Sequence, residues 1–276
     1  MSSSAPIVIE AGRPLRHYWR DLWSHRELFY FLAWRDILVR YKQTLIGIAW
    51  SGLRPLLTMV ILTVVFGKLA NLPSAGGAPY PVFVFIGLLP WQFFCNCVSD
   101  TSNSLIENAN MLTKIYFPRL IVPLSIVIVS ILDFIIACVI LAGLMLWFAF
   151  VPNWRVITIP IFFSLAVFIS IGVGVWLAAL NVRYRDFRFV VPFLIQVGTY
   201  LSPVGFTSSI VPGRWRWVYS LNPMVGVIDG FRWAILGPTF NLYLPSLGIS
   251  VVVAAVLFTL SVSYFRKTER ALADIV

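Results

Sequence analysis

The sequence predicts an all-α membrane protein with six transmembrane helices, an N-terminal amphipathic interface helix and a re-entrant outer helix pair between spans five and six. Hydrophobic residues make up 59% of the 276 residues and charged residues 12%, and the mean hydropathy is +0.87. Soluble domains carry about 25% charged residues. Six apolar runs approach the roughly 20 residues that a bilayer crossing needs: Leu53–Leu69, Tyr80–Val98, Leu120–Phe150, Trp154–Leu180, Phe189–Phe206 and Leu244–Phe265.

Residues 1–52 form the predicted N-terminal segment, which precedes a transmembrane domain at 53–265 and a short tail at 266–276. From Trp34 to Pro55 this segment changes from amphipathic to apolar. On a helical wheel the apolar positions fall on one side and the charged ones on the others, the pattern of a helix that lies against membrane lipids. The extreme N-terminus has no apolar region typical of a signal peptide, so we expect the first span to direct insertion.

Lysine and arginine residues are unevenly divided between the two sides of the six spans. Cytoplasmic segments carry the excess of these residues. We therefore place both termini in the cytoplasm and expect a multi-pass protein of a bacterial inner membrane. The richer side holds the N-terminal arginines together with Lys42, Arg54, Lys114, Arg119, Arg183, Arg185, Arg188, Arg266, Lys267 and Arg270.

Several function classes are disfavoured by the sequence. The net charge of +10 is explained by topology and anionic lipids, so we expect no nucleic-acid partner. Cys95, Cys97 and Cys138 lie in or beside apolar runs without a nearby histidine, so no metal site is expected. No G-x-x-x-x-G-K-[ST], H-E-x-x-H or G-x-S-x-G motif occurs. We therefore expect no enzyme activity and no cofactor bound by this chain.

The loop between spans two and three contains a predicted short helix. Ser104 and Glu107 have the spacing of a capping box, in which each side chain satisfies a free backbone N–H of the first helical turn. Lys114 closes this segment and Pro118 precedes the next helix. Such a helix either connects two spans or docks on a cytoplasmic partner, and the residues alone favour the first alternative.

Asp133 is the one carboxylate well inside a predicted apolar run. Ionisable groups within membranes are costly, which makes them functional candidates. The sequence leaves two interpretations open. We favour a neutral acid that is hydrogen-bonded to a neighbouring span, because no second acid or histidine is predicted inside the spans to complete a relay. The alternative is an ion-coupled secondary transporter or channel that uses Asp133.

The outer segment from Ser202 to Tyr243 is rich in Pro, Gly and Trp. Two apolar stretches, Trp215–Leu221 and Met224–Leu236, are too short to span a bilayer and are separated by an Asn-Pro turn signal. They predict two re-entrant helices at about 213–237, and such helices are tolerated where they are buried in protein or border a pathway. An aromatic belt at the headgroups is an equally good interpretation of the individual tryptophans.

Four stretches together resemble the membrane subunit of ABC-2 type polysaccharide exporters. The resemblance covers nearly the whole chain and is strongest to O-antigen exporter permeases, with teichoic acid and capsular polysaccharide exporters as relatives. The four stretches are RYKQTLIGIAWSGLRP (Arg40–Pro55), NANMLTKIYFPR (Asn108–Arg119), NVRYRDF (Asn181–Phe187) and LNPMVGVIDGFRWAILG (Leu221–Gly237).

The resemblance implies a homodimer that works with two copies of a separate cytoplasmic ATPase, which uses ATP and Mg. It also implies a glycan substrate carried on a polyprenyl diphosphate lipid. The segment at about 104–113 would be the coupling helix, with Ser104, Glu107, Asn108, Asn110, Met111 and Leu112 as coupling residues. The outer helices would form a gate with Trp215, Trp217, Asn222, Pro223, Asp229 and Arg232.

Four basic residues near the first span are the candidates for substrate loading: Arg35, Arg40, Lys42 and Arg54. Cations at this position attract anionic headgroups, and the diphosphate of a lipid carrier would be drawn by the same field. For each single residue, topology and headgroup contact alone remain the favoured explanation.

Overall fold

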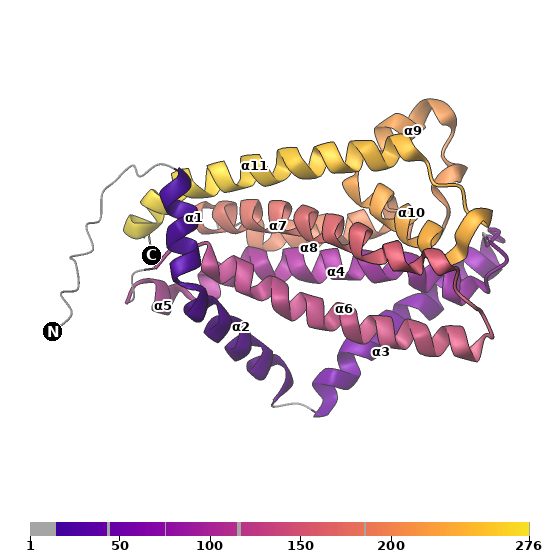
Figure 1. The fold of residues 1–276 in the computed structure, drawn as a ribbon, viewed down its shortest axis with the longest axis horizontal. Coiled ribbons are helices and arrows are strands. Elements are labelled where there is room, and N and C mark those ends of the chain that lie inside the picture. The colour runs from indigo at the N-terminus through magenta and orange to yellow at the C-terminus, as the bar shows by residue number, and fades with distance from the viewer. Residues whose placement is uncertain (1–14, 43–44, 75, 115–116, 185, 276) are drawn as a thin grey trace.

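The computed structural model describes residues 15–42, 45–74, 76–114, 117–184 and 186–275, and these residues form helices and irregular segments without a β-strand. The all-α prediction is confirmed. Figure 1 shows a bundle of long helices with shorter helices at both ends. The helices are α1 (Leu15–Ser24), α2 (Arg26–Tyr41), α3 (Leu45–Leu62), α4 (Tyr80–Glu107), α5 (Ala109–Leu112), α6 (Ile121–Trp147), α7 (Ile159–Arg183), α8 (Phe187–Leu201), α9 (Gly213–Tyr219), α10 (Pro223–Leu236) and α11 (Leu244–Ile275).

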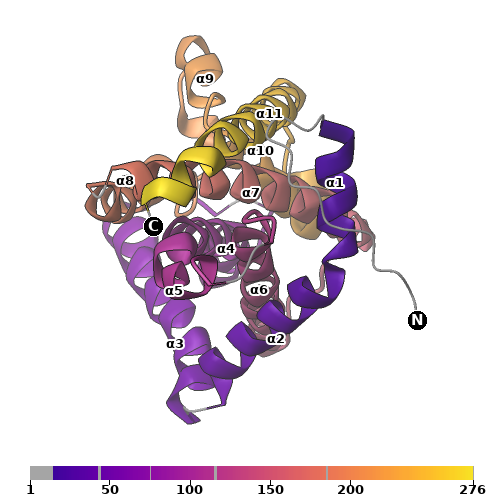
Figure 2. The ribbon, with the colours of Figure 1, turned by 90° about the vertical axis from the view of Figure 1, so that its left-hand side faces the viewer.

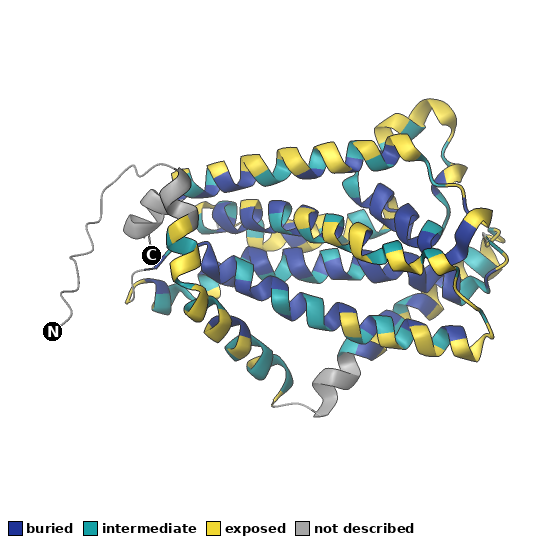
Figure 3. Ribbon diagram, in the orientation of Figure 1, coloured by how far each residue is buried: buried dark blue, intermediate teal, exposed yellow. Residues whose placement is uncertain are grey.

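Helix α4 forms the centre of the bundle. It packs against α7, α6, α10, α3 and α8, and it is the most completely buried of the long helices (Figure 3). Because it is surrounded on all sides, its first three turns are apolar around the whole circumference, with Val82–Trp91 entirely buried. A helix that is apolar on every face is the one expected in the interior of a bundle.

Five helical segments of the described chain are long and apolar enough to cross a membrane: Ser51–Leu69, Tyr80–Glu107, Ile121–Trp147, Trp154–Arg183 and Leu244–Thr268. They match five of the six predicted runs. The remaining run corresponds to α8, which has 15 residues. At ~1.5 Å per residue α8 is about 22 Å long, shorter than the ~30 Å hydrocarbon core. The sixth crossing therefore stays a prediction.

The two ends of the bundle are built differently. Helices α1, α2 and α5 and the end of α11 lie at one end, whereas α9 and α10 lie toward the other (Figures 1 and 2). At the first end a separate apolar cluster joins α2, α5 and the inner turns of α4, α6, α7 and α11 through side chains that include Leu32, Leu105, Leu112 and Phe265. We call these the inner end and the outer end. Their orientation in a membrane stays a prediction.

The predicted capping box at Ser104 and Glu107 is wrong. Helix α4 continues without interruption through both residues to Glu107. The hydroxyl of Ser104 donates to the carbonyl oxygen of Thr101 at 2.7 Å, as expected inside a helix, and Leu105 is buried in the inner cluster. The short helix α5 begins only after Asn108, whose side-chain amide donates to the carbonyl of Ser104 at 2.9 Å. Burial of Leu105 extends α4 past the local capping signal.

Candidate functional site

A network of charged side chains joins α2 to two membrane helices near the inner end. Arg40, in the last turn of α2, places Nη1 2.8 Å from Oδ2 of Asp100 on α4 and Nη2 2.8 Å from Oδ2 of Asp133 on α6. Tyr41 donates its hydroxyl to Oδ1 of Asp133 at 2.5 Å. One interface helix is thereby fixed to two candidate spans.

The structural role favoured for Asp133 is consistent with its contacts, but its partners lie on α2 and not on a neighbouring span. Asp133 is 8% exposed; one carboxyl oxygen lies 2.8 Å from Arg40, and the other accepts a hydrogen bond from Tyr41. A cation and a hydrogen-bond donor on α2 thus compensate this buried group for the loss of water. Asp133 therefore acts as an anchor for α2.

The network contains a second acid, Asp100. It lies on the long candidate span Tyr80–Glu107, two residues beyond Val98, where the apolar run read from the sequence ends. The expectation that no second acid lies inside the membrane stays a prediction, because a helix of 28 residues is longer than a ~30 Å hydrocarbon core. Arg40 compensates one of the two acids by charge, and it contacts both.

The electrostatics at the end of α2 favour the protonated forms of its polar side chains. Burial lowers the pKa of Arg40, but the carboxylates of Asp133 and Asp100 raise it by more, so the net change is upward. Burial raises the pKa of the Tyr41 hydroxyl, and its hydrogen bond to Asp133 raises it further. Arg40 therefore remains a cation and Tyr41 remains a donor in neutral solution.

Arg35 connects the predicted loading residues with the predicted coupling residues. Its Nη2 donates to Oδ1 of Asn108 at 2.8 Å, and its Nη1 lies 3.9 Å from the sulfur of Met111. It also forms an ion pair with Asp36 at 2.7 Å. The interface helix thus contacts the α4–α5 junction directly, a contact between positions that the sequence treated as separate sites.

Lys42 and Arg54 differ from the other two loading candidates. Both residues are exposed, and within the described chain neither has a carboxylate at ion-pair distance, whereas Arg35 and Arg40 do. Of the four predicted loading residues, these two have no ion-pair partner among the residues that the structure describes.

The coupling segment presents a polar surface at the inner end. Glu107 and Asn110 are exposed, whereas Leu112 is buried in the inner cluster that also contains Leu32 of α2. Helix α5 lies at the tip of this end, facing the viewer in Figure 2. The exposed residues are placed to meet another molecule, and the buried leucine fixes α5 to the bundle.

At the outer end a second network holds the segment Ser202–Ser208 against α10. Arg232 is 0% exposed and donates from Nη1 to the carbonyl of Phe206 and from Nη2 to the carbonyl of Val204, both at 2.7 Å. These carbonyls become available because α8 ends at Leu201. The guanidinium also lies over the ring of Phe83, 4.0 Å from its centroid.

Asp229 and Asn222 also hold segment 202–208 against α10. Asp229 accepts a hydrogen bond from the Ser208 hydroxyl at 2.5 Å. Asn222 donates to the Ser202 hydroxyl at 2.9 Å, and its carbonyl oxygen accepts from the backbone N–H of Met224, capping α10. Pro223 occupies the first helical position, where its missing N–H has no cost. Segment 202–208 and α10 are therefore held together along their length.

Helix α9 is attached much less firmly than α10. None of its residues is buried, and Trp215 and Trp217 are 56% and 57% exposed. Its main anchor is Tyr243, whose ring lies 4.0 Å from the Arg216 guanidinium carbon and packs edge-on against Trp217. The structure thus separates the six predicted gate residues into a fixed group on and beside α10 and an exposed group on α9.

Sequence reasoning missed Asp100, Tyr41 and Ser208. Asp100 was assigned to a loop because the apolar run ends before it. Tyr41 was counted as an apolar residue of the interface helix, although a tyrosine hydroxyl near a buried acid is a natural donor. Ser208 carries no local signal, since serine is common in loops.

The architecture is that of an all-α polytopic membrane protein with shorter helices at both ends of the bundle. The sequence profile described as "ABC-2 type transporter" matches residues 27–236. The chain belongs to the ABC-2 type transporter family.

Curated relatives extend the match over most of the chain. The O-antigen export system permease protein RfbA of Klebsiella pneumoniae is 27% identical over 91% of this chain and 95% of its own length. RfbA of Myxococcus xanthus is 27% identical over 77% of this chain and 82% of its own. The polysialic acid transport protein KpsM of Escherichia coli is 26% identical over 86% and 92%, respectively. The sequence-based identification of the family is confirmed, and the relatives support a role in polysaccharide export.

Proposed function

We propose that this chain is the membrane-spanning subunit of an ATP-driven exporter that moves a lipid-linked polysaccharide out of the cytoplasm. The preferred substrate is O-antigen on a polyprenyl diphosphate carrier. The observation that carries the proposal is the RfbA similarity, which extends over 91% of this chain and 95% of the Klebsiella relative. The KpsM similarity supports the broader class of anionic or neutral bacterial glycans.

Energy would come from a partner. The sequence lacks a phosphate-binding P-loop, so we assign ATP and Mg to two copies of a separate cytoplasmic ATPase that serve a homodimer of this chain. The polar surface at the α4–α5 junction supports this assignment, because Glu107 at the end of α4 and Asn110 on α5 are exposed, and Leu112 fixes α5 to the bundle. Both chain termini would then lie on the cytoplasmic side.

The alternative of ion coupling through Asp133 receives no support from its surroundings. An ion-coupling carboxylate exchanges its partner during transport. Here one oxygen of Asp133 is paired with Arg40 and the other accepts from Tyr41. These contacts support an anchoring role.

Docking of the ATPase is tested by adding positive charge at two exposed positions, Glu107 at the end of α4 and Asn110 on α5. The variant Glu107→Lys with Asn110→Lys should lose the co-purifying ATPase and glycan export, while its thermal unfolding should stay within about 1 °C of the unmodified protein because both side chains are exposed. Lys267→Glu, an equally exposed change at the inner end, is the matched control. A fully coupled complex in the double variant would contradict docking at α5.

The outer gate is tested by a crosslink on the exposed helix. A cysteine at Trp217 of each subunit, joined across the proposed dimer, should block export, and reduction should restore it. Position 217 is preferable to Asn222 or Asp229, because those two side chains hold segment 202–208. Unchanged export after complete crosslinking would show that α9 is not part of the gate.

A further inference from the structure

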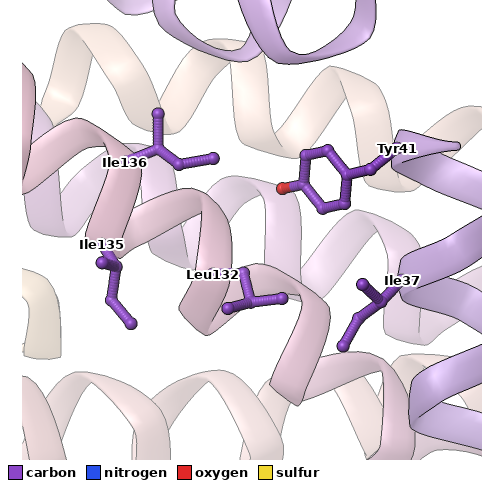
Figure 4. Close-up of a pocket in the computed structure, with 5 residues that line it drawn as sticks. All are labelled: Ile37, Tyr41, Leu132, Ile135 and Ile136. Carbon is purple, nitrogen blue, oxygen red and sulfur yellow. The ribbon is translucent and has the colours of Figure 1, made fainter. Parts of the chain in front are cut away.

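An apolar cleft lies between the interface helix α2 and the span α6. Its volume is about 350 Å³, and it is lined by Ile37, Tyr41, Leu132, Ile135 and Ile136. In Figure 4, Ile37 and Tyr41 project from α2 toward the three α6 side chains. The one polar atom among these side chains, the Tyr41 hydroxyl, is already engaged with Asp133. The cleft therefore offers no free hydrogen-bonding group to a ligand.

Water is a poor occupant for such a space. A water in this open cleft finds no free polar partner on the lining side chains, whereas ordered waters typically make about three hydrogen bonds. An empty cleft is also unfavourable, because its lining loses dispersion contacts on one side. A hydrocarbon chain satisfies both conditions.

The cleft continues into an exposed apolar stripe on α6. Ile135 at its edge is 51% exposed, and one turn further along α6 Val139 is 68% exposed. Helix α6 is long and apolar enough to cross a membrane, so this exposed stripe is available to lipid. A chain that lies along it reaches the cleft without crossing a polar barrier.

Lys42 directly follows the cleft residue Tyr41 in the chain and caps α2. It is exposed and has no acidic partner within the described residues. It lies between an interface helix and the first span, which is the level of the lipid headgroups. Cations at this level attract anionic headgroups.

We propose that this cleft binds one acyl chain of an anionic phospholipid whose headgroup lies against Lys42. The lipid fills the wedge between α2 and α6 beside the Tyr41–Asp133 contact and stabilises the position of the interface helix. The inference requires only that the chain is a membrane protein, so it is independent of the proposed function.

The test uses the full-length protein in nanodiscs with phosphatidylglycerol that carries a photoreactive diazirine on its acyl chain. Mass spectrometry should locate the label on peptides that contain Ile37 and Leu132–Ile136. Ile136→Trp, which fills the cleft, should abolish this label, whereas Val139→Trp, on the same stripe outside the cleft, should leave it. Labelling by phosphatidylglycerol should fall about fivefold in Lys42→Gln, the effect of one basic residue at a membrane surface.

Three outcomes would overturn the proposal. Label that is absent from the cleft peptides, or equal in Ile136→Trp, would show that no chain enters the cleft. Equal labelling by phosphatidylcholine would show that the site does not require an anionic headgroup. Displacement of the label by an equimolar polyprenyl phosphate would assign the cleft to an isoprenoid chain. Thermal unfolding of each variant, with and without phosphatidylglycerol, separates lost binding from lost folding, because bound lipid raises the stability of the folded state only where its site is intact.

Discussion

Two arginines, one near each end of the bundle, show two different ways of keeping a cation inside a membrane protein. Arg40 has a side chain that is 36% exposed and pairs with carboxylates on two separate helices. Arg232 is completely buried, and its guanidinium donates to backbone carbonyls of one segment. The first arrangement joins three separate helices through their side chains. The second arrangement is part of the fold itself, because these backbone carbonyls have no helical hydrogen-bond partners once α8 has ended.

Loss of the outer arginine should have the largest effect. Arg232→Ala leaves the carbonyls of Val204 and Phe206 buried without donors and opens a cavity beside Phe83, so we expect a loss of about 3–5 kcal/mol in the free energy of unfolding. Thermal and denaturant unfolding of the purified protein measures this. Arg214→Ala, an exposed change on α9, should stay within about 0.5 kcal/mol. Equal stability of the two variants would contradict the structural role of Arg232.

Substitutions in the network around Arg40 should lower the free energy of unfolding less than Arg232→Ala, and their effects should depend on one another. Asp133→Asn removes one of the two acids that Arg40 contacts, and we expect a cost of about 1–3 kcal/mol, reduced from the fully buried case because Arg40 is partly exposed. Arg40→Gln should cost a similar amount.

A double-mutant cycle tests whether these two residues act together. The combination of Arg40→Gln and Asp133→Asn should be less destabilising than the sum of the single changes, with a coupling energy of about 0.5–3 kcal/mol. Strict additivity would mean that the ion pair contributes nothing to the attachment of α2.

The smallest effect is expected on α9. Trp215→Ala and Trp217→Ala remove side chains that are more than half exposed, so each should change the free energy of unfolding by no more than about 0.5 kcal/mol. Asn222→Ala, which removes the cap of α10 and its bond to Ser202, should cost about 1–2 kcal/mol. A large loss at Trp215 would contradict the division into a fixed α10 and a weakly attached α9.

Most of the architecture could be predicted because it depends on local apolar runs. Five membrane-crossing helices and the α9–α10 break at Asn222 follow from hydrophobicity and turn chemistry alone. A helix that ends at Tyr41 was also predictable from the wheel that begins at Trp34, although residues 43–44 of that stretch lie outside the described residues. Its position at a membrane interface stays a prediction.

The networks could not be predicted, because they depend on contacts between distant positions. Arg40 meets Asp100 across 60 positions, and Tyr41 meets Asp133 across 92. The capping box failed for a related reason: its local signal at Ser104 competes with the burial of Leu105, and burial stabilises the longer helix. For the same reason, counting basic residues near the first span could not show which of them pair with acids. Arg35 and Arg40 do, whereas Lys42 and Arg54 have no acidic partner among the described residues.

The most direct test of the proposed function is transport in proteoliposomes that contain this chain and its co-purified ATPase. A lipid-linked O-antigen should cross the bilayer only when ATP and Mg are supplied on the side of the ATPase, and imposed proton or sodium gradients should have no effect. Arg40→Gln and Lys267→Glu serve as the variant and its control. Glycan movement that is driven by an ion gradient without ATP, and abolished by Asp133→Asn, would contradict the assignment as an ATP-driven permease.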